Sequence, residues 1–356
     1  MRFKSLLQIS GLIYLLSPTL LANTALKSDI QDWSKISHPE SSDRVANFAG
    51  ESYFSDSLSD SELSVSGYFS LLSGDIEVSA NDPEVEIPTD LDISIEGNAF
   101  GASAHYGFKT RFGVFRPKLF VAQIDSETKT TREGLSETQG SAATILLPGL
   151  YFHRSIGPGL LTVFAGTVSV DTKDKDELTE NNVRIDTDYN QLQLGVNYFL
   201  GKTQFGIHYR QGVYDEFIVA TDENSTSGTE VYQPRSQYFY VKQMIGKNLI
   251  VGLGVSTNHN DHVSDEDKGV GGYFNRYRLT AQGAFQNFKT DNEFQWMREK
   301  SEGETVIYSL RSTNFWAFNS LELGPSLSYS AVDTKGVFTD TEFVVWDFGL
   351  NIRYSI

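Results

Sequence analysis

The chain has 356 residues, of which 39% are hydrophobic and 13% aromatic, and its formal net charge is -17. So acidic a protein is a poor candidate for binding nucleic acid, because its charge repels the phosphates. The chain contains no cysteine, which excludes disulfide bonds and thiol chemistry. The sequence also lacks a phosphate-binding glycine signature, an HExxH pair and a nucleophile elbow. No catalytic residue, metal site or cofactor is therefore predicted.

Residues 1–25 have the layout of a secretory signal peptide. Two basic residues precede the apolar run Leu6–Leu21, and Ala22 and Ala25 offer small residues for cleavage. The helix-breaking pair Ser17-Pro18 argues against a retained membrane anchor. No later segment has the roughly 20 consecutive apolar residues that a membrane helix needs. If the mature protein lies in a membrane, it must cross it with strands.

Residues 26–62 are polar, rich in Ser and Asp, and weakly patterned. This composition favours a periplasmic lead-in that is disordered or lies against the rest of the molecule. The alternative is a plug inside the following domain, anchored by Trp33, Tyr53 and Phe54. Residues 63–356 form the predicted main domain.

Apolar and polar residues alternate through most of residues 63–356. In one example, Leu249, Val251 and Leu253 alternate with Ile250, Gly252 and Gly254. Strict period-2 patterns of this kind predict strands with one apolar and one polar face. Repeated along the chain, they are typical of a closed antiparallel transmembrane β-barrel, an all-β fold with lipid outside and a polar interior.

The predicted connections alternate between short and long. Short turns are expected on the periplasmic side and long loops on the extracellular side. With Ser64–Ser79 as one first strand, about fourteen strands result; an additional strand at Arg44–Phe54 and a turn at Ser73-Gly74 would give about sixteen. The short turns are predicted near Lys109–Arg111, Ile156–Pro158, Gly201–Lys202, Gly246–Lys247, Asn287–Asp291 and Phe318–Ser320. The long loops are predicted near Asn81–Asp90, Ser126–Gly140, Thr172–Ile185, Thr221–Pro234, Asn260–Val270 and Asp333–Asp340.

Several of the long loops concentrate acidic residues, at Asp171–Glu180, Asp222-Glu223 and Asp265–Asp267. The simplest interpretation is a solvated surface whose charge keeps neighbouring molecules apart. The alternative is binding of divalent cations, which would bridge the loops to lipopolysaccharide phosphates, because carboxylate oxygens suit Ca²⁺ and Mg²⁺.

Charged and histidine side chains occupy the polar parity of the predicted strands. A charge facing lipid at mid-depth costs about 2 to 4 kcal/mol in a barrel, so these side chains should point inward. They either fill the lumen as a structural network or line an aqueous path that favours anionic solutes. These lumen-lining candidates are His208, Arg210, Arg276, Arg278, Arg311, Glu322, Asp347 and Arg353.

The last residues of the chain form one more alternating strand. Here the chain resembles the bacterial outer-membrane β-barrels of porin-like architecture, whose final strand carries an aromatic residue third from the end and apolar residues at alternate positions. The matching positions, an expected signal for assembly, are Phe348, Leu350, Ile352, Tyr354 and Ile356. The last of them departs from the pattern, since Ile356 stands where Phe or Trp is usual. The resemblance implies a bacterial outer-membrane location, contact with outer-membrane lipids and lipopolysaccharide, and recognition by the barrel-assembly machinery.

Three classes of function follow from this resemblance. The first is a porin-like channel or transport protein for small solutes, which is the preferred interpretation. The second is an outer-membrane enzyme of the lipid-modifying or protease type, for which His105 near Ser103, His153 and His208 are the candidates for a base. The third is a structural or adhesive barrel whose loops bind partners.

Overall fold

The computed structural model describes residues 63–355, apart from 81–90, 133–134, 175–182, 221–227, 263–271, 301–303 and 336–338. The predicted signal peptide, the polar segment 26–62 and the terminal Ile356 lie outside the described residues. No helix in the part of the chain described here is long and apolar enough to cross a membrane.

The described residues form strands joined mainly by short connections. The strands are β1 (Leu63–Ala80), β2 (Asp92–Tyr106), β3 (Phe108–Thr110), β4 (Gly113–Arg132), β5 (Leu135–Ile156), β6 (Gly159–Asp174), β7 (Val183–Leu200), β8 (Thr203–Ala220), β9 (Gly228–Ile245), β10 (Leu249–His262), β11 (Gly272–Phe285), β12 (Phe288–Lys300), β13 (Glu304–Phe318), β14 (Leu321–Lys335) and β15 (Thr339–Ser355).

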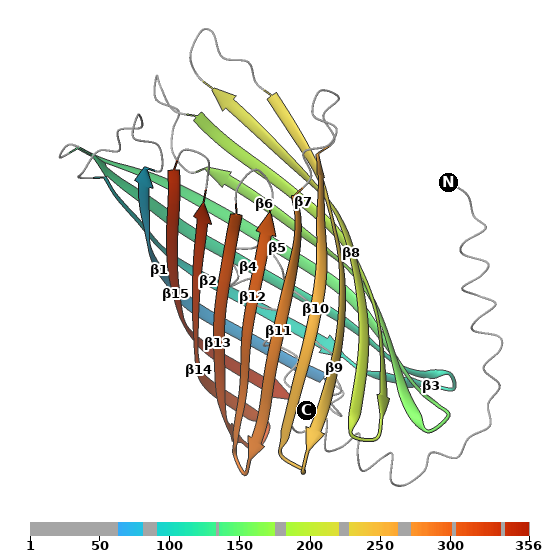
Figure 1. Ribbon diagram of the computed structural model, residues 1–356. Coiled ribbons are helices and arrows are strands. Elements are labelled where there is room, and N and C mark those ends of the chain that lie inside the picture. Colours follow the sequence, from blue (N-terminus) through green and yellow to red (C-terminus); the bar gives the residue numbers. More distant parts are fainter. Residues whose placement is uncertain are drawn as a thin grey trace.

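The strands close into a single antiparallel barrel (Figure 1). β1 pairs with the last strand, β15, on one side and with β2 on the other. β2 also pairs with β4, and the three-residue β3, which follows β2 after Gly107, pairs with β4 too. Because β2 and β3 make one crossing, the fifteen strands form a ring of fourteen. The predicted fourteen-stranded barrel is confirmed.

The alternative count of sixteen strands is wrong. It required a turn at Ser73-Gly74, but these residues pair with Trp346 and Val345 in the middle of the β1–β15 ladder. β1 continues from Leu63 to Ala80 without a break.

The short turns lie at one rim of the barrel, together with the end of β15, at the bottom of Figure 1. Gly157, Gly201 and Gly246 have φ of 56°, 56° and 67°, a left-handed conformation that glycine adopts without strain and that tight hairpins require. The turn between β11 and β12 is Gln286-Asn287, and the predicted position at Asn287–Asp291 is wrong. Gln286 has φ 54° without being glycine, so the usual sequence signal for this turn is missing.

The strands also extend into several segments that we predicted as long loops. Most of Ser126–Gly140 belongs to the β4–β5 hairpin, because β4 ends at Arg132 and β5 begins at Leu135. β7 and β9 likewise begin within predicted loops, at Val183 and Gly228. Backbone hydrogen bonds between strands do not depend on side-chain polarity, so pairing continues beyond the apolar part of each strand.

Apolar side chains form a belt around the outer face of the barrel. Leu253 is 67% exposed, and Phe348 and Leu350 are 55% and 53% exposed. The neighbouring outward positions Ile352 and Tyr354 are exposed as well, so every described member of the predicted assembly signal faces outward. Such a belt would be unfavourable in water but matches a hydrocarbon surrounding.

We expect a charged substitution on the outer face to destabilise the barrel most within the apolar belt and least at its polar edge. Leu253→Arg should lower the free energy of unfolding by about 2 to 4 kcal/mol, because the charge would face hydrocarbon. The matched change Gln237→Arg on neighbouring β9 should cost about 0 to 1 kcal/mol, since Gln237 pairs with Thr257 at the polar edge of the same face. Urea unfolding in lipid vesicles, followed by tryptophan fluorescence, measures both. Equal losses would contradict the assignment of the belt.

Candidate functional site: the interior of the barrel

The predicted lumen-lining residues are buried inside the barrel. Arg210 is 2% exposed, and the other seven have side chains that are buried or nearly so. They do not form one cluster. Arg276, Arg278 and Arg311 lie together on β11 and β13, whereas Glu322 and Arg353 belong to a separate group near the turn rim. Their role in lining a path for solutes stays a prediction.

The first group, which we call the charged inner wall, consists of Arg276, Arg278, Asp291, Glu293 and Arg311 on β11 to β13. The Glu293 carboxylate lies 3.5 Å from the Arg278 Nε and 3.5 Å from the Arg311 Nη2, and all three side chains are about 7% exposed. Glu293 also accepts a hydrogen bond from Gln295. Within these five residues three cations face two carboxylates, so the wall carries a surplus of positive charge.

Aromatic rings connect the charged inner wall to β8 and β9. The Arg278 guanidinium lies 5.0 Å from the centre of the Tyr238 ring, a cation–π arrangement. Tyr238 stacks on Tyr240, and both rings pack edge-on against His208. His208 Nε2 lies 3.2 Å from the amide oxygen of Asn197. The buried histidine is therefore held by rings and an amide.

Inward aromatic rings lie close against glycines of neighbouring strands. A Cβ added at Gly206 would stand 2.2 Å from the Tyr240 ring, and one at Gly195 would stand 1.9 Å from the Phe164 ring. Only glycine permits contacts this close. The rings therefore pack against the wall of the barrel.

A second group, the apolar inner wall, was not predicted. It consists of buried side chains on β4, β5 and β6, with Tyr68 and Val170 packed against it. These residues point into the interior, which we predicted to be polar. The inner face is therefore not uniformly polar. The members are Phe120, Ala122, Ile145, Leu147, Tyr151, Phe164 and Val168.

The two inner walls lie on opposite sides of the barrel. In the closed ring of fourteen, β5 at the centre of the apolar inner wall is seven strands away from β12 at the centre of the charged inner wall. The interior therefore presents an apolar surface opposite the charged inner wall. On the apolar side, β4 also buries Arg116 and Lys118.

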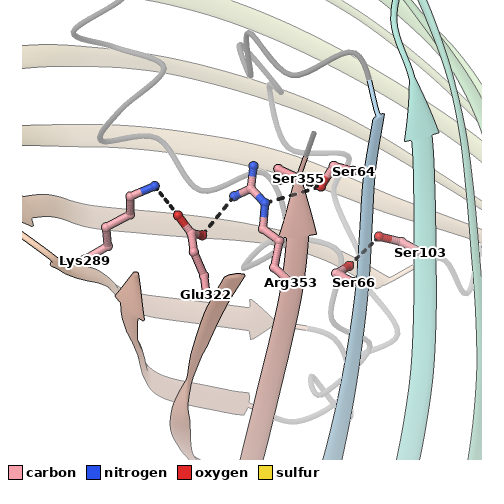
Figure 2. A network of polar contacts seen from close by, with 7 residues as sticks. All are labelled: Ser64, Ser66, Ser103, Lys289, Glu322, Arg353 and Ser355. Carbon is pink, nitrogen blue, oxygen red and sulfur yellow. Dashed lines mark hydrogen bonds and ion pairs between the residues drawn. The ribbon is translucent and has the colours of Figure 1, made fainter. Parts of the chain in front are cut away.

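A third group of polar side chains joins the first and last strands near the turn rim (Figure 2). Glu322 binds the Lys289 Nζ at 2.5 Å and the Arg353 Nη1 at 3.5 Å. Arg353 Nε then donates to the Ser64 hydroxyl at 3.4 Å, and Ser355 donates to the same oxygen at 3.1 Å. This closure network links β12, β14 and β15 to β1 at the point where the barrel closes.

Two of the histidines considered as possible catalytic bases contact neutral groups, since His153 Nδ1 lies 2.9 Å from the Thr162 hydroxyl and His208 Nε2 lies 3.2 Å from the Asn197 amide oxygen. Ser103, the serine considered with His105, shares a 2.7 Å hydrogen bond with Ser66. In the described part of the chain, no group of three or more His, Asp or Glu residues could hold a metal ion. The acidic stretch 175–180, the acidic pair 222–223 and the three acidic residues 265–267 lie outside the described residues.

Sequence reasoning missed Asp291, Glu293 and Lys289, which supply both carboxylates of the charged inner wall and one end of the closure network. The misplaced turn explains why Lys289 and Asp291 were missed, because Asn287–Asp291 was not expected to be a strand, and Glu293 follows shortly after this range. A period-2 pattern of Lys289, Asp291, Glu293 and Gln295 was the available signal.

No family model matches the chain, and no curated protein matches it in sequence. Several solved structures match its fold. A Pseudomonas aeruginosa FadL homologue is 9% identical with a TM-score of 0.54, and the match covers 84% of this chain and 91% of that one. The Pseudomonas putida toluene transporter TodX is 6% identical with a TM-score of 0.51, covering 83% and 90%. A deletion mutant of TodX, described as a monoaromatic hydrocarbon channel, is 8% identical with a TM-score of 0.52, covering 84% and 91%.

At such low identity these likenesses concern the fold alone, and they agree with the closed ring and its apolar belt. The chain has the closed-barrel fold of these bacterial outer-membrane proteins. The fold and the apolar belt agree with the predicted location in the outer membrane. Its belt faces lipid, and its inner walls and closure network are shielded from it.

The closure network should contribute to the stability of this outer-membrane barrel. Glu322→Gln removes the carboxylate shared by Lys289 and Arg353 and leaves two mostly buried cations together, at a cost of about 2 kcal/mol. The matched change Glu304→Gln should cost less than about 1 kcal/mol, because the Arg298–Glu304 pair is 43% and 38% exposed. Denaturant unfolding in vesicles compares the variants, and an equal effect would contradict a structural role for the network.

The contact between rings and glycines gives a separate prediction. Gly206→Ala should lower the free energy of unfolding by about 1 to 3 kcal/mol, because the new methyl group overlaps the Tyr240 ring. Gly67→Ala on the outer face should be nearly neutral, since its Cβ would meet the nearest atom at 3.5 Å. The same unfolding measurement tests the pair.

Proposed function

We propose that the protein is a transport channel for small hydrophobic solutes across the outer membrane. The single observation that carries the proposal is the apolar inner wall, because a passage for polar solutes alone has no need of buried apolar side chains on its inner face. The likeness to barrels described as toluene or monoaromatic hydrocarbon channels supports the same direction.

The charged inner wall indicates which hydrophobic solutes this channel would prefer. An apolar surface opposite a cationic surface suits a solute with a hydrophobic body and a negative or electron-rich polar end. A cation in a low-dielectric interior acts on a nearby anion more strongly than the same charge does in bulk water. The acidic loops predicted outside the membrane act through screened water and oppose this preference only weakly.

Uptake into proteoliposomes tests the channel directly. Relative to protein-free vesicles, we expect the protein to increase the rate of radiolabelled toluene uptake by a factor several times larger than the factor for glycerol. Leu147→Asn, which places an amide in the apolar inner wall, should slow toluene uptake severalfold, because toluene would then pass a polar surface. The control Ser309→Ala, on the opposite side, should leave uptake unchanged. Heat-modifiable migration on gels verifies that each variant is folded.

Equal increases for toluene and glycerol over protein-free vesicles would replace the proposal with a general diffusion pore. Uptake no faster than in protein-free vesicles would remove the transport role altogether.

The ionic preference is tested by reversal potentials in planar bilayers. Arg210→Gln combined with Arg276→Gln should shift the selectivity toward cations, because two positive charges leave the interior. Arg278 and Arg311 are kept, since each is paired with Glu293. A folded double variant with unchanged selectivity would assign these arginines to a structural network.

A further inference from the structure

Four polar side chains interrupt the apolar outer face on β12 and β13. Thr290 and Asn292 of β12 pair directly with Asn314 and Ser312 of β13, so that the four form a compact block. All four have the outward parity of their strands and are half-buried. We call this block the outer polar patch.

The outer polar patch lies within the apolar belt and not at its edge. Along β12, Phe288 precedes the patch and Phe294 follows it on the same face. Along β13, Leu310 precedes it and Trp316 follows it. The side chains of Phe294, Leu310 and Trp316 are 42%, 53% and 44% exposed. The patch is therefore at a depth where the surroundings are hydrocarbon.

The patch is only half satisfied by its own hydrogen bonds. Asn292 Nδ2 donates to the Thr290 hydroxyl at 3.0 Å and to the Ala281 carbonyl oxygen at 3.5 Å. Asn314 Nδ2 donates to the Ser312 hydroxyl at 3.3 Å. Neither amide oxygen accepts a hydrogen bond from any residue in the described ranges. An amide acceptor exposed to hydrocarbon without a donor costs several kcal/mol, and lipid tails supply no donor.

We propose that the outer polar patch is a contact surface between two copies of this chain within the outer membrane. The patch is complementary to itself, because each asparagine carries both amide donors and an acceptor. A two-fold axis through the block would bring the same four side chains of each copy together, so that each amide oxygen meets an amide or hydroxyl donor of the other copy.

One neighbour of the patch is small, because Ala281 of β11 pairs with Asn292. Small residues beside polar ones are common where membrane segments meet, because they let backbones approach.

Cysteine cross-linking tests the proposal without interference, since the chain has no cysteine of its own. We expect Ser312→Cys to give a disulfide-linked dimer on mild oxidation in outer membranes, with at least tenfold more product than Ala165→Cys. Ala165 is an outward, exposed position on β6, seven strands away in the ring of fourteen, so it measures random collision. Equal yields, or cross-linking of Ser312→Cys to a different protein, would overturn the proposal.

A second variant tests the chemistry of the contact. Asn292→Leu combined with Asn314→Leu keeps side-chain size but removes both amides, so the dimer seen by native mass spectrometry should be lost. The barrel itself should stay folded and heat-modifiable, because leucine suits a lipid-facing position. A dimer that persists in the double variant would show that other surfaces hold it, and the outer polar patch would not be the interface.

Discussion

The structure depends on one constraint, the need to pair every backbone N–H and C=O within hydrocarbon. An open sheet would leave two unpaired edges, and each exposed polar group would cost several kcal/mol. The chain meets the constraint by pairing its first and last strands over their whole length, from Ser64 with Ser355 to Ala80 with Thr339. The closure network adds side-chain contacts at one end of this seam, where Arg353 and Ser355 both reach Ser64. The division into a lipid face and an interior follows from this closure.

Closure also explains why so much of the fold could be predicted. Once strands must alternate between lipid and interior, each residue's face follows from its parity, as Leu253 outside and Arg278 inside illustrate. The signal fails where a strand is polar on both faces. In β12, Thr290 and Asn292 face outward while Asp291 and Glu293 face inward, so a short polar segment resembles a turn in sequence. The extended hairpins beyond the belt were missed for a similar reason, because pairing there leaves no hydrophobic pattern.

The interior was less predictable than the fold. Parity indicates that an arginine points inward, but not which carboxylate it meets, because Arg278 and Arg311 share Glu293 through strand register. Register depends on turn lengths, and the turn before β12 has no glycine to mark it. The apolar inner wall has the opposite difficulty. Ile145 and Phe164 occupy inward positions next to apolar outward neighbours, and a strand that is apolar on both faces shows no period at all.

The glycines explain how the interior can hold many large side chains. Tyr240 and Phe164 fill space beside glycines of adjacent strands that a Cβ would otherwise occupy. Rings that use this space leave more room in the interior for the side chains of the opposite strands. The apolar and charged inner walls can therefore face each other in a ring of fourteen strands, and each keeps the side chains that its chemistry needs. One strand, β12, carries the carboxylates Asp291 and Glu293 inward and the amide of Asn292 outward, so the interior and the membrane-facing surface are polar at the same strand.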